Sequence, residues 1–229
     1  MSVWRPYPPS IFGDRTIGLL GGSFNPAHDG HRHIALTALA RLGLDEIWWM
    51  VSPQNPLKDA SDLLPLKDRV ASAEAMAQHP AMRVTDLETA LGTTYTAETL
   101  RIISAMYPHY RFVWIMGADN LIQIPKWKDW SKIFNTVPIA VFARPTYSVS
   151  ALSGVAAQRF ARRRVSENHA RTLARTAAPA WTFIHCRLHS ASATAIRASL
   201  AASFDDGSSG IPLTGDRTVG LGGRPETGG

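Results

Sequence analysis

The chain has 229 residues, of which 45% are hydrophobic and 18% are charged, a balance typical of one globular domain. It lacks an apolar run of about 18 residues and an apolar stretch of signal-peptide length near its start, so neither a membrane span nor a secretory signal is expected. A single cysteine, Cys186, excludes an internal disulfide framework and a cysteine-based zinc site, and it favours a cytoplasmic protein.

The net charge of +6, from 24 basic and 18 acidic residues, fits an anionic ligand such as a nucleotide. Six arginines fall between Arg159 and Arg175, against one acid, Glu167. Such a run is typical of a solvated helix face. Phe160 is the one aromatic residue interleaved with it, and no known nucleic-acid-binding module stands out, so nucleic acid is not the expected partner.

Residues 1–15 are predicted to form an extended lead-in, because Pro6, Pro8 and Pro9 discourage a helix. Short apolar runs then alternate with longer amphipathic stretches. The apolar runs predict six strands, at Thr16–Leu20, Glu46–Val51, Met82–Asp86, Arg111–Met116, Ile139–Ala143 and Thr182–Cys186. The amphipathic stretches predict helices at His31–Leu42, Leu66–Gln78 and Thr96–Tyr107.

The predicted strands are apolar without alternation, which indicates burial on both faces of a sheet. Helices between the strands indicate parallel pairing, so the expected fold class is α/β with a doubly wound, mostly parallel sheet. One domain is expected to span residues 16–204. Residues 205–229 are rich in glycine and poor in apolar side chains, so this tail is predicted to be disordered.

The first predicted strand leads into GGSFNPAHDGH, residues 21–31, and then into a helix. The string contains neither GxxxxGK[ST] nor GxGxxG, so it is not a P-loop or the usual dinucleotide fingerprint. Gly21 and Gly22 have no Cβ, so backbone amides there can approach a phosphate closely. The start of the helix near Gly30 adds N–H groups and the positive end of the helix dipole.

His28 and His31 are three residues apart and can face one site at the entrance of this helix. Two imidazoles there can donate hydrogen bonds to a phosphoryl oxygen whose charge grows in the transition state. Two other interpretations stay open at this point: the histidines could be structural, or the pair could bind a metal. No further cysteine or acidic ligand stands nearby in the sequence, so no metal site is expected.

The string GGSFNPAHDGH resembles the H-x-G-H signature of the nucleotidylyltransferase superfamily, in the form G-G-x-F-[DN]-P-x-H-x-G-H of bacterial nicotinate mononucleotide adenylyltransferases. Further segments resemble motifs of that family in the same order. They are TYTAETL at 94–100, MGADNL at 116–121, IPKWKDW at 124–130, the Arg-Pro pair at 144–145 and SATAIR at 192–197. The resemblance runs from about residue 16 to residue 203, and it implies a Rossmann-like nucleotidylyltransferase fold.

The resemblance implies transfer of an adenylyl group from ATP to nicotinate mononucleotide, with release of pyrophosphate, in NAD biosynthesis. Mg²⁺ is expected to accompany ATP, because many negative oxygens come together. Catalytic roles are implied for His28, His31 and Arg197. The residues implied for ATP binding are Gly21, Gly22, Ser23, Phe24, His28, His31, Gly117, Asp119, Ser192, Thr194 and Arg197.

The mononucleotide is expected to contact Tyr95, Thr96 and Trp127. The flat indole of Trp127 can stack on a pyridine ring, and a helix that starts at Thr96 would favour a carboxylate over an amide. Lys58 and Arg69 are the cations expected to meet the mononucleotide phosphate.

Rival functions are adenylyl transfer to nicotinamide mononucleotide or to phosphopantetheine, and non-catalytic binding of nucleotides or nucleic acid. TYTAETL and the P-x-W segment argue against phosphopantetheine, and the histidine loop argues for an enzyme. A homo-oligomer stays open.

Overall fold

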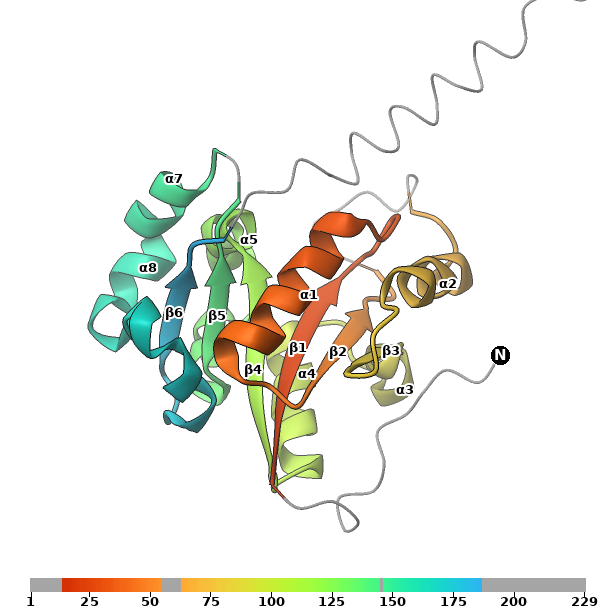
Figure 1. The fold of residues 1–229 in the computed structure, drawn as a ribbon, viewed down its shortest axis with the longest axis horizontal. Coiled ribbons are helices and arrows are strands. Elements are labelled where there is room, and N and C mark those ends of the chain that lie inside the picture. The colour runs from red at the N-terminus through yellow and green to blue at the C-terminus, as the bar shows by residue number, and fades with distance from the viewer. Residues whose placement is uncertain (1–13, 55–62, 145, 187–229) are drawn as a thin grey trace, which may run out of the picture.

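The computed structural model describes residues 14–54, 63–144 and 146–186. Six parallel strands form one sheet in the order β3-β2-β1-β4-β5-β6, which confirms the doubly wound α/β class (Figure 1). The strands are β1 (Arg15–Gly22), β2 (Glu46–Val51), β3 (Met82–Thr85), β4 (Tyr110–Gly117), β5 (Ile139–Phe142) and β6 (Trp181–Ile184). Most of the predicted lead-in, the end of the predicted domain and the tail at 205–229 lie outside the described residues.

Helices cover both faces of this sheet (Figure 1). The α-helices are α1 (Asp29–Leu42), α2 (Leu66–Met76), α3 (Leu87–Leu91), α4 (Thr96–Met106), α5 (Ala118–Gln123), α6 (Trp130–Thr136), α7 (Ser148–Ser153) and α8 (Val155–Arg159). Three further segments are 3₁₀-helices: η1 (Ile124–Lys126), η2 (Ala161–Arg163) and η3 (Glu167–Arg175). Apolar residues of α1, α2 and η3 form one core cluster with the sheet, and those of α3 to α8 form the other.

Most buried strand residues are apolar, with Glu46, Thr85 and Thr182 as polar exceptions, which explains the absence of alternation in the sequence. In β2, Trp48 and Met50 join the cluster under α4, whereas Ile47 and Trp49 join the cluster under α1. All six residues of β2 are buried. A strand that is covered on both faces and paired on both edges offers a rigid support for the loops at its ends.

The chain runs outward from β1 through β2 to β3, then returns to the centre and runs outward again from β4 to β6. The direction of winding therefore changes between β1 and β4. In open α/β sheets, ligands bind outside the carboxyl ends of the strands at such a switch point. The loop after β1 and the helix after β4 are placed there by topology alone.

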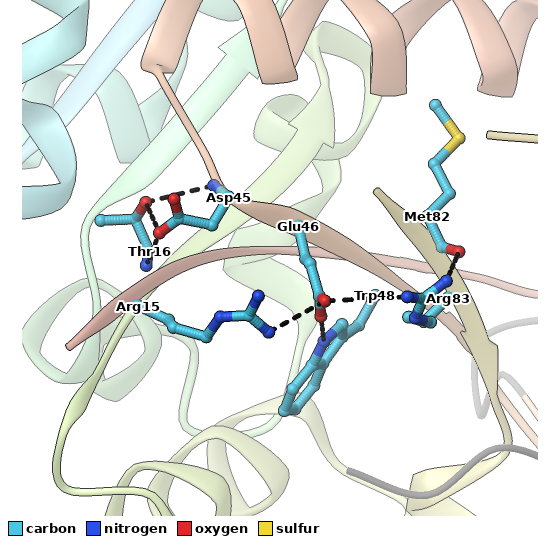
Figure 2. A network of polar contacts seen from close by, with 7 residues as sticks. All are labelled: Arg15, Thr16, Asp45, Glu46, Trp48, Met82 and Arg83. Carbon is cyan, nitrogen blue, oxygen red and sulfur yellow. Dashed lines mark hydrogen bonds and ion pairs between the residues drawn. The ribbon is translucent and has the colours of Figure 1, made fainter. Parts of the chain in front are cut away.

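A polar network closes the opposite, amino end of the sheet (Figure 2). The buried Glu46 carboxylate accepts a hydrogen bond from Arg15 Nη1 at 3.0 Å and from Trp48 Nε1 at 3.3 Å, and it pairs with Arg83 at 3.9 Å. These contacts join the starts of β1, β2 and β3. A cavity of about 550 Å³ borders this network, at the end of the sheet opposite the switch point.

The structure differs from the predicted elements chiefly near the first glycines. Strand β1 continues through Gly21 and Gly22, which pair with Met50 and Val51. A Cβ on Gly21 would collide with the indole of Trp114, so the missing side chain makes room for a core ring. The short helices α3, α5, α6, α7 and α8, of five to seven residues, were not predicted, because so few residues show little periodicity.

Among the described residues, no helix is long and apolar enough to cross a membrane.

Candidate active site

His28 and His31 cap the first turn of α1 reciprocally. His28 is the N-cap residue, and its Nδ1 accepts a hydrogen bond from the backbone N–H of Gly30 at 3.1 Å. The backbone N–H of His28 in turn donates to Nδ1 of His31 at 3.3 Å. The ring centroids lie 3.8 Å apart, and His28 is only 4% exposed. Two imidazoles thus do the work that serine and glutamate do in an ordinary capping box.

These contacts determine which nitrogen carries the proton. A backbone N–H can only donate, so Nδ1 of each ring must be an unprotonated acceptor. In the neutral imidazole the proton then lies on Nε2, which makes Nε2–H the donor of both rings. The pair therefore presents two Nε2 donors at the positive end of a 14-residue helix, an arrangement suited to binding phosphate.

The rings of Phe24 and Trp49 pack against His31. The Phe24 ring stacks on Trp49 with centroids 5.2 Å apart, and it meets the edge of His31 at 4.9 Å. The Phe24 side chain is 2% exposed and belongs to the core cluster under α1, so ATP contact by Phe24 stays a prediction. Its role in this structure is to position His31.

Arg69 is also a buried residue. Its side chain is 1% exposed and donates to four backbone carbonyls, and its contact with the mononucleotide phosphate stays a prediction. Nη1 donates to Ser23 at 2.8 Å and to Ser52 at 2.6 Å, while Nε and Nη2 donate to Leu64 and Pro53 at 2.9 and 2.8 Å. Arg69 thus joins the loops after β1 and β2. Burial lowers the pKa of this guanidinium from its ordinary value.

Gly117 and Asp119 lie at the carboxyl end of β4, beside the end of β1. Asp119 Oδ1 pairs with Nε of Arg144 at 3.2 Å. A Cβ on Gly117 would lie 2.6 Å from the same Nε, so only glycine leaves room for this pair. No role for Arg144 was predicted from the Arg-Pro motif of the sequence. Its ion pair with Asp119 places it at the same edge of the sheet.

The segments of Tyr95 and Trp127, 32 residues apart in the chain, meet in the structure. Thr96 is the first residue of α4, as predicted, and Tyr95 is its N-cap. Lys128 Nζ lies 4.3 Å from the centroid of the Tyr95 ring. The adjacent Trp127 is partly buried against the core cluster under α4. The structure therefore brings three predicted mononucleotide contacts, Tyr95, Thr96 and Trp127, into one region.

Glu88 on α3 is a buried carboxyl that the sequence analysis missed. It is 6% exposed, and its Oε1 accepts a hydrogen bond from the Thr99 hydroxyl at 3.4 Å. Burial raises the pKa of Glu88 to about 7, although the hydroxyls of Ser52 and Thr99 favour the ionised form. The available signal was a glutamate directly after a buried leucine, Leu87, in a short apolar segment.

Lys58, Ser192, Thr194 and Arg197 lie outside the described residues, so their predicted contacts stay predictions. Gly21, Gly22 and Ser23 are described, and they lie at the end of β1, before the histidine pair in the chain. Their contacts with ATP stay predictions. In the described ranges, no group of three or more histidine, cysteine or acidic residues is arranged to hold a metal ion.

Comparison with known proteins agrees with this geometry. Residues 19–199 match the model of the cytidylyltransferase-like family. A curated protein of Rhizobium meliloti, "Probable nicotinate-nucleotide adenylyltransferase", is 53% identical over 183 residues, which cover 80% of this chain and 97% of that protein. A protein of the same name from Roseobacter denitrificans is 49% identical over 189 residues, covering 82% and 94%. The chain belongs to the nicotinate-nucleotide adenylyltransferase family.

Solved structures support the family's fold. The nicotinic acid mononucleotide adenylyltransferase of Plasmodium falciparum, complexed with NaAD, matches with a TM-score of 0.61 over 80% of this chain and 83% of that one. The sequences are 18% identical, so this likeness concerns the fold alone. The fold, more than the sequence, is what the two proteins share.

The arginine-rich segment lies away from the switch point and contacts the protein itself. Arg159 lies 5.4 Å from the Trp130 ring, and Arg164 lies 5.3 Å from the Trp181 ring. Arg171 donates to the carbonyl of Ala40 at 3.4 Å. Half of the six arginines thus pack on their own chain, as expected for a solvated surface with long stems on aromatic rings.

The buried carboxyl predicts a pH-dependent stability. The pKa of Glu88 is about 7 in the fold, against an ordinary value of 4.5, so the neutral form stabilises the fold fully below pH 4.5 and this contribution is lost as pH rises through 7. At 1.36 kcal/mol per pH unit, the loss is about 3 kcal/mol. In Glu88→Gln, which cannot ionise, this loss should be absent.

Urea unfolding between pH 4.5 and pH 8.5 measures the difference. The free energy of unfolding of the unmodified protein should fall by about 3 kcal/mol relative to Glu88→Gln over this range. The exposed Glu98→Gln is the matched control and should follow the unmodified protein to within about 0.5 kcal/mol. A constant difference between the unmodified protein and Glu88→Gln would contradict the raised pKa.

Proposed function

We propose that the protein transfers the adenylyl group of ATP to nicotinate mononucleotide, forming nicotinate adenine dinucleotide and pyrophosphate. The observation that carries the proposal is the capped histidine pair, which presents two Nε2 donors at the N-terminus of α1 beside the switch point of the sheet. The names of the curated relatives support the same reaction and place it in NAD biosynthesis.

The reaction needs no nucleophile from the protein. An oxygen of the mononucleotide phosphate attacks the α-phosphorus of ATP in line; a new P–O bond forms as the bond to the β-phosphate bridge breaks, and pyrophosphate leaves with the electron pair. Catalysis therefore rests on positioning and on stabilising negative charge. In this proposal the Nε2–H groups of His28 and His31 donate to the phosphate oxygens on which that charge grows.

The other end of the mononucleotide meets the start of α4. Because Tyr95 is the N-cap, the first backbone N–H groups of this 11-residue helix have no intrahelical partner. They suit the carboxylate of the nicotinate ring, while Trp127 offers an indole for the ring to stack on. Asp119 and Gly117 are proposed to meet the ribose and adenine of ATP. Lys58, Ser192, Thr194 and Arg197 are proposed as further phosphate contacts.

Mg²⁺ fits this site as a partner of the triphosphate. The described residues offer no cluster of acidic ligands that would hold the ion alone, whereas the histidine pair and helix end suit the phosphates that carry it. When bound, Mg²⁺ neutralises charge on the phosphate oxygens. The substrates and the single cysteine support a cytoplasmic location.

The substrate is tested by measuring pyrophosphate release with ATP and three acceptors: nicotinate mononucleotide, nicotinamide mononucleotide and phosphopantetheine. An amide NH₂ that faces N–H donors loses about 1–3 kcal/mol, so kcat/KM for the acid should exceed that for the amide by about 5–150-fold. Equal values, or a preference for the amide, would overturn the acid assignment and leave adenylyl transfer standing. Turnover with phosphopantetheine alone would overturn both.

The histidine pair is tested with His31→Ala. Loss of one donor to the transition state typically costs about 10²–10³-fold in rate, so kcat should fall by that factor while the KM for ATP changes far less. His109→Ala is the matched control, because His109 is exposed at the amino end of β4 and should keep full activity. A folded His31→Ala protein with near-full turnover would rule out the role.

A further inference from the structure

Glu88 occupies a junction between the two halves of the proposed site. On one side lies Ser52 at the end of β2, whose backbone N–H donates to Gly22 at 2.9 Å and whose carbonyl accepts from Arg69 at 2.6 Å. On the other side lies Thr99 in the first turn of α4. One buried carboxyl thus contacts the support of the phosphate loop and the support of the α4 start.

The contacts of Thr99 continue to the helix N-terminus. Its hydroxyl lies 2.8 Å from the Thr93 hydroxyl and 3.2 Å from the Tyr95 carbonyl, besides 3.4 Å from Glu88 Oε1. Thr93 is tied back to Glu88, because its N–H donates to the Glu88 carbonyl at 3.0 Å. The segment from residue 93 to residue 99 is therefore joined to Glu88 at both of its ends, through Thr93 and Thr99, and Tyr95 lies between these two contacts.

The direction of these hydrogen bonds depends on the proton of Glu88. The Thr99 hydroxyl has one hydrogen to share. A protonated Glu88 donates its own hydrogen to a neighbouring hydroxyl and leaves that of Thr99 for the Tyr95 carbonyl. An ionised Glu88 can only accept, so it draws the Thr99 hydrogen away from Tyr95. The neutral carboxyl is thus the form that completes the turn.

We propose that Glu88 is a positioning residue for the nicotinate end of the mononucleotide, which acts by holding the Thr93–Thr99 turn so that the N–H groups at the start of α4 meet the ring carboxylate. This inference rests on the proposed function. It assigns Glu88 to the acceptor side of the site, because Ser52 on the other side is also held by Gly22 and Arg69. The turn that Glu88 holds contains Tyr95 and Thr96 and contains neither histidine.

The neutral form of the side chain is well populated near pH 7, since burial raises the pKa of Glu88 to about 7. A glutamine at this position keeps the shape and a donor, so Glu88→Gln should preserve the turn. Glu88→Ala removes the carboxyl and leaves the Thr99 and Ser52 hydroxyls without it. The pair of variants separates the hydrogen bond from the charge.

The experiment compares Glu88→Ala, Glu88→Gln and the exposed control His109→Ala at pH 7, with kcat and KM for ATP and for both pyridine mononucleotides. Glu88→Ala should raise the KM for nicotinate mononucleotide about tenfold, as expected for a lost buried hydrogen-bond partner, and should leave the KM for ATP within about twofold. The ratio of acid to amide kcat/KM should fall. Glu88→Gln should restore the KM to within about threefold, and His109→Ala should match the unmodified protein.

Equal rises in the KM for ATP and for the mononucleotide, or a fall in kcat alone, would overturn the positioning role, because a general structural defect would produce them. So would a folded Glu88→Ala protein with unchanged constants. Should Glu88→Ala fail to fold, Thr99→Val removes the hydrogen bonds of the Thr99 hydroxyl and keeps the Glu88 carboxyl. A KM for the mononucleotide that Thr99→Val does not change would count against the proposal. Absence of turnover in the unmodified protein would instead refute the proposed function, so the two failures are distinct.

Discussion

The reciprocal cap between His28 and His31 is the constraint on which the rest of the site depends. Each Nδ1 is occupied by a backbone N–H, so each ring has one orientation and keeps its proton on Nε2. The same hydrogen bonds that begin α1 therefore fix the two Nε2–H donors at the N-terminus of this helix. In the proposed function, a substitution of either histidine would therefore disturb both the start of the helix and the binding of phosphate.

The buried side chains around the cap keep it in place. Phe24 and Trp49 form a floor under His31, and Arg69 joins the loops that follow β1 and β2 through four carbonyls. Side chains that are fixed by packing and hydrogen bonds can hold reacting groups within a fraction of an ångström. The polar network of Glu46 joins the amino ends of β1, β2 and β3. Strands β1 and β2 are therefore held at both of their ends.

The sequence predicted the sheet and the histidine loop well, because both depend on local patterns. The apolar runs around Trp48 and Val113 can be buried only between two helical layers, and the string from Gly21 to His31 is long and specific. The burial of Arg69 and Phe24 was not predicted, because a cation and an aromatic ring look alike in a sequence whether they face a ligand or the core. Glu88 was missed because its hydrogen-bond partners, Ser52 and Thr99, come from other segments of the chain.

The most direct measurement of the central claim is ¹⁵N NMR of histidine side chains in the folded protein, with His28 and His31 assigned through the His28→Ala and His31→Ala variants. Above pH 8, where imidazoles are neutral, both residues should show a protonated Nε2 and an unprotonated Nδ1, and the Nε2 signals should move when a non-hydrolysable ATP analogue binds. A proton on Nδ1 of either ring would contradict the cap, and Nε2 signals that do not respond to the analogue would contradict the placing of the phosphates.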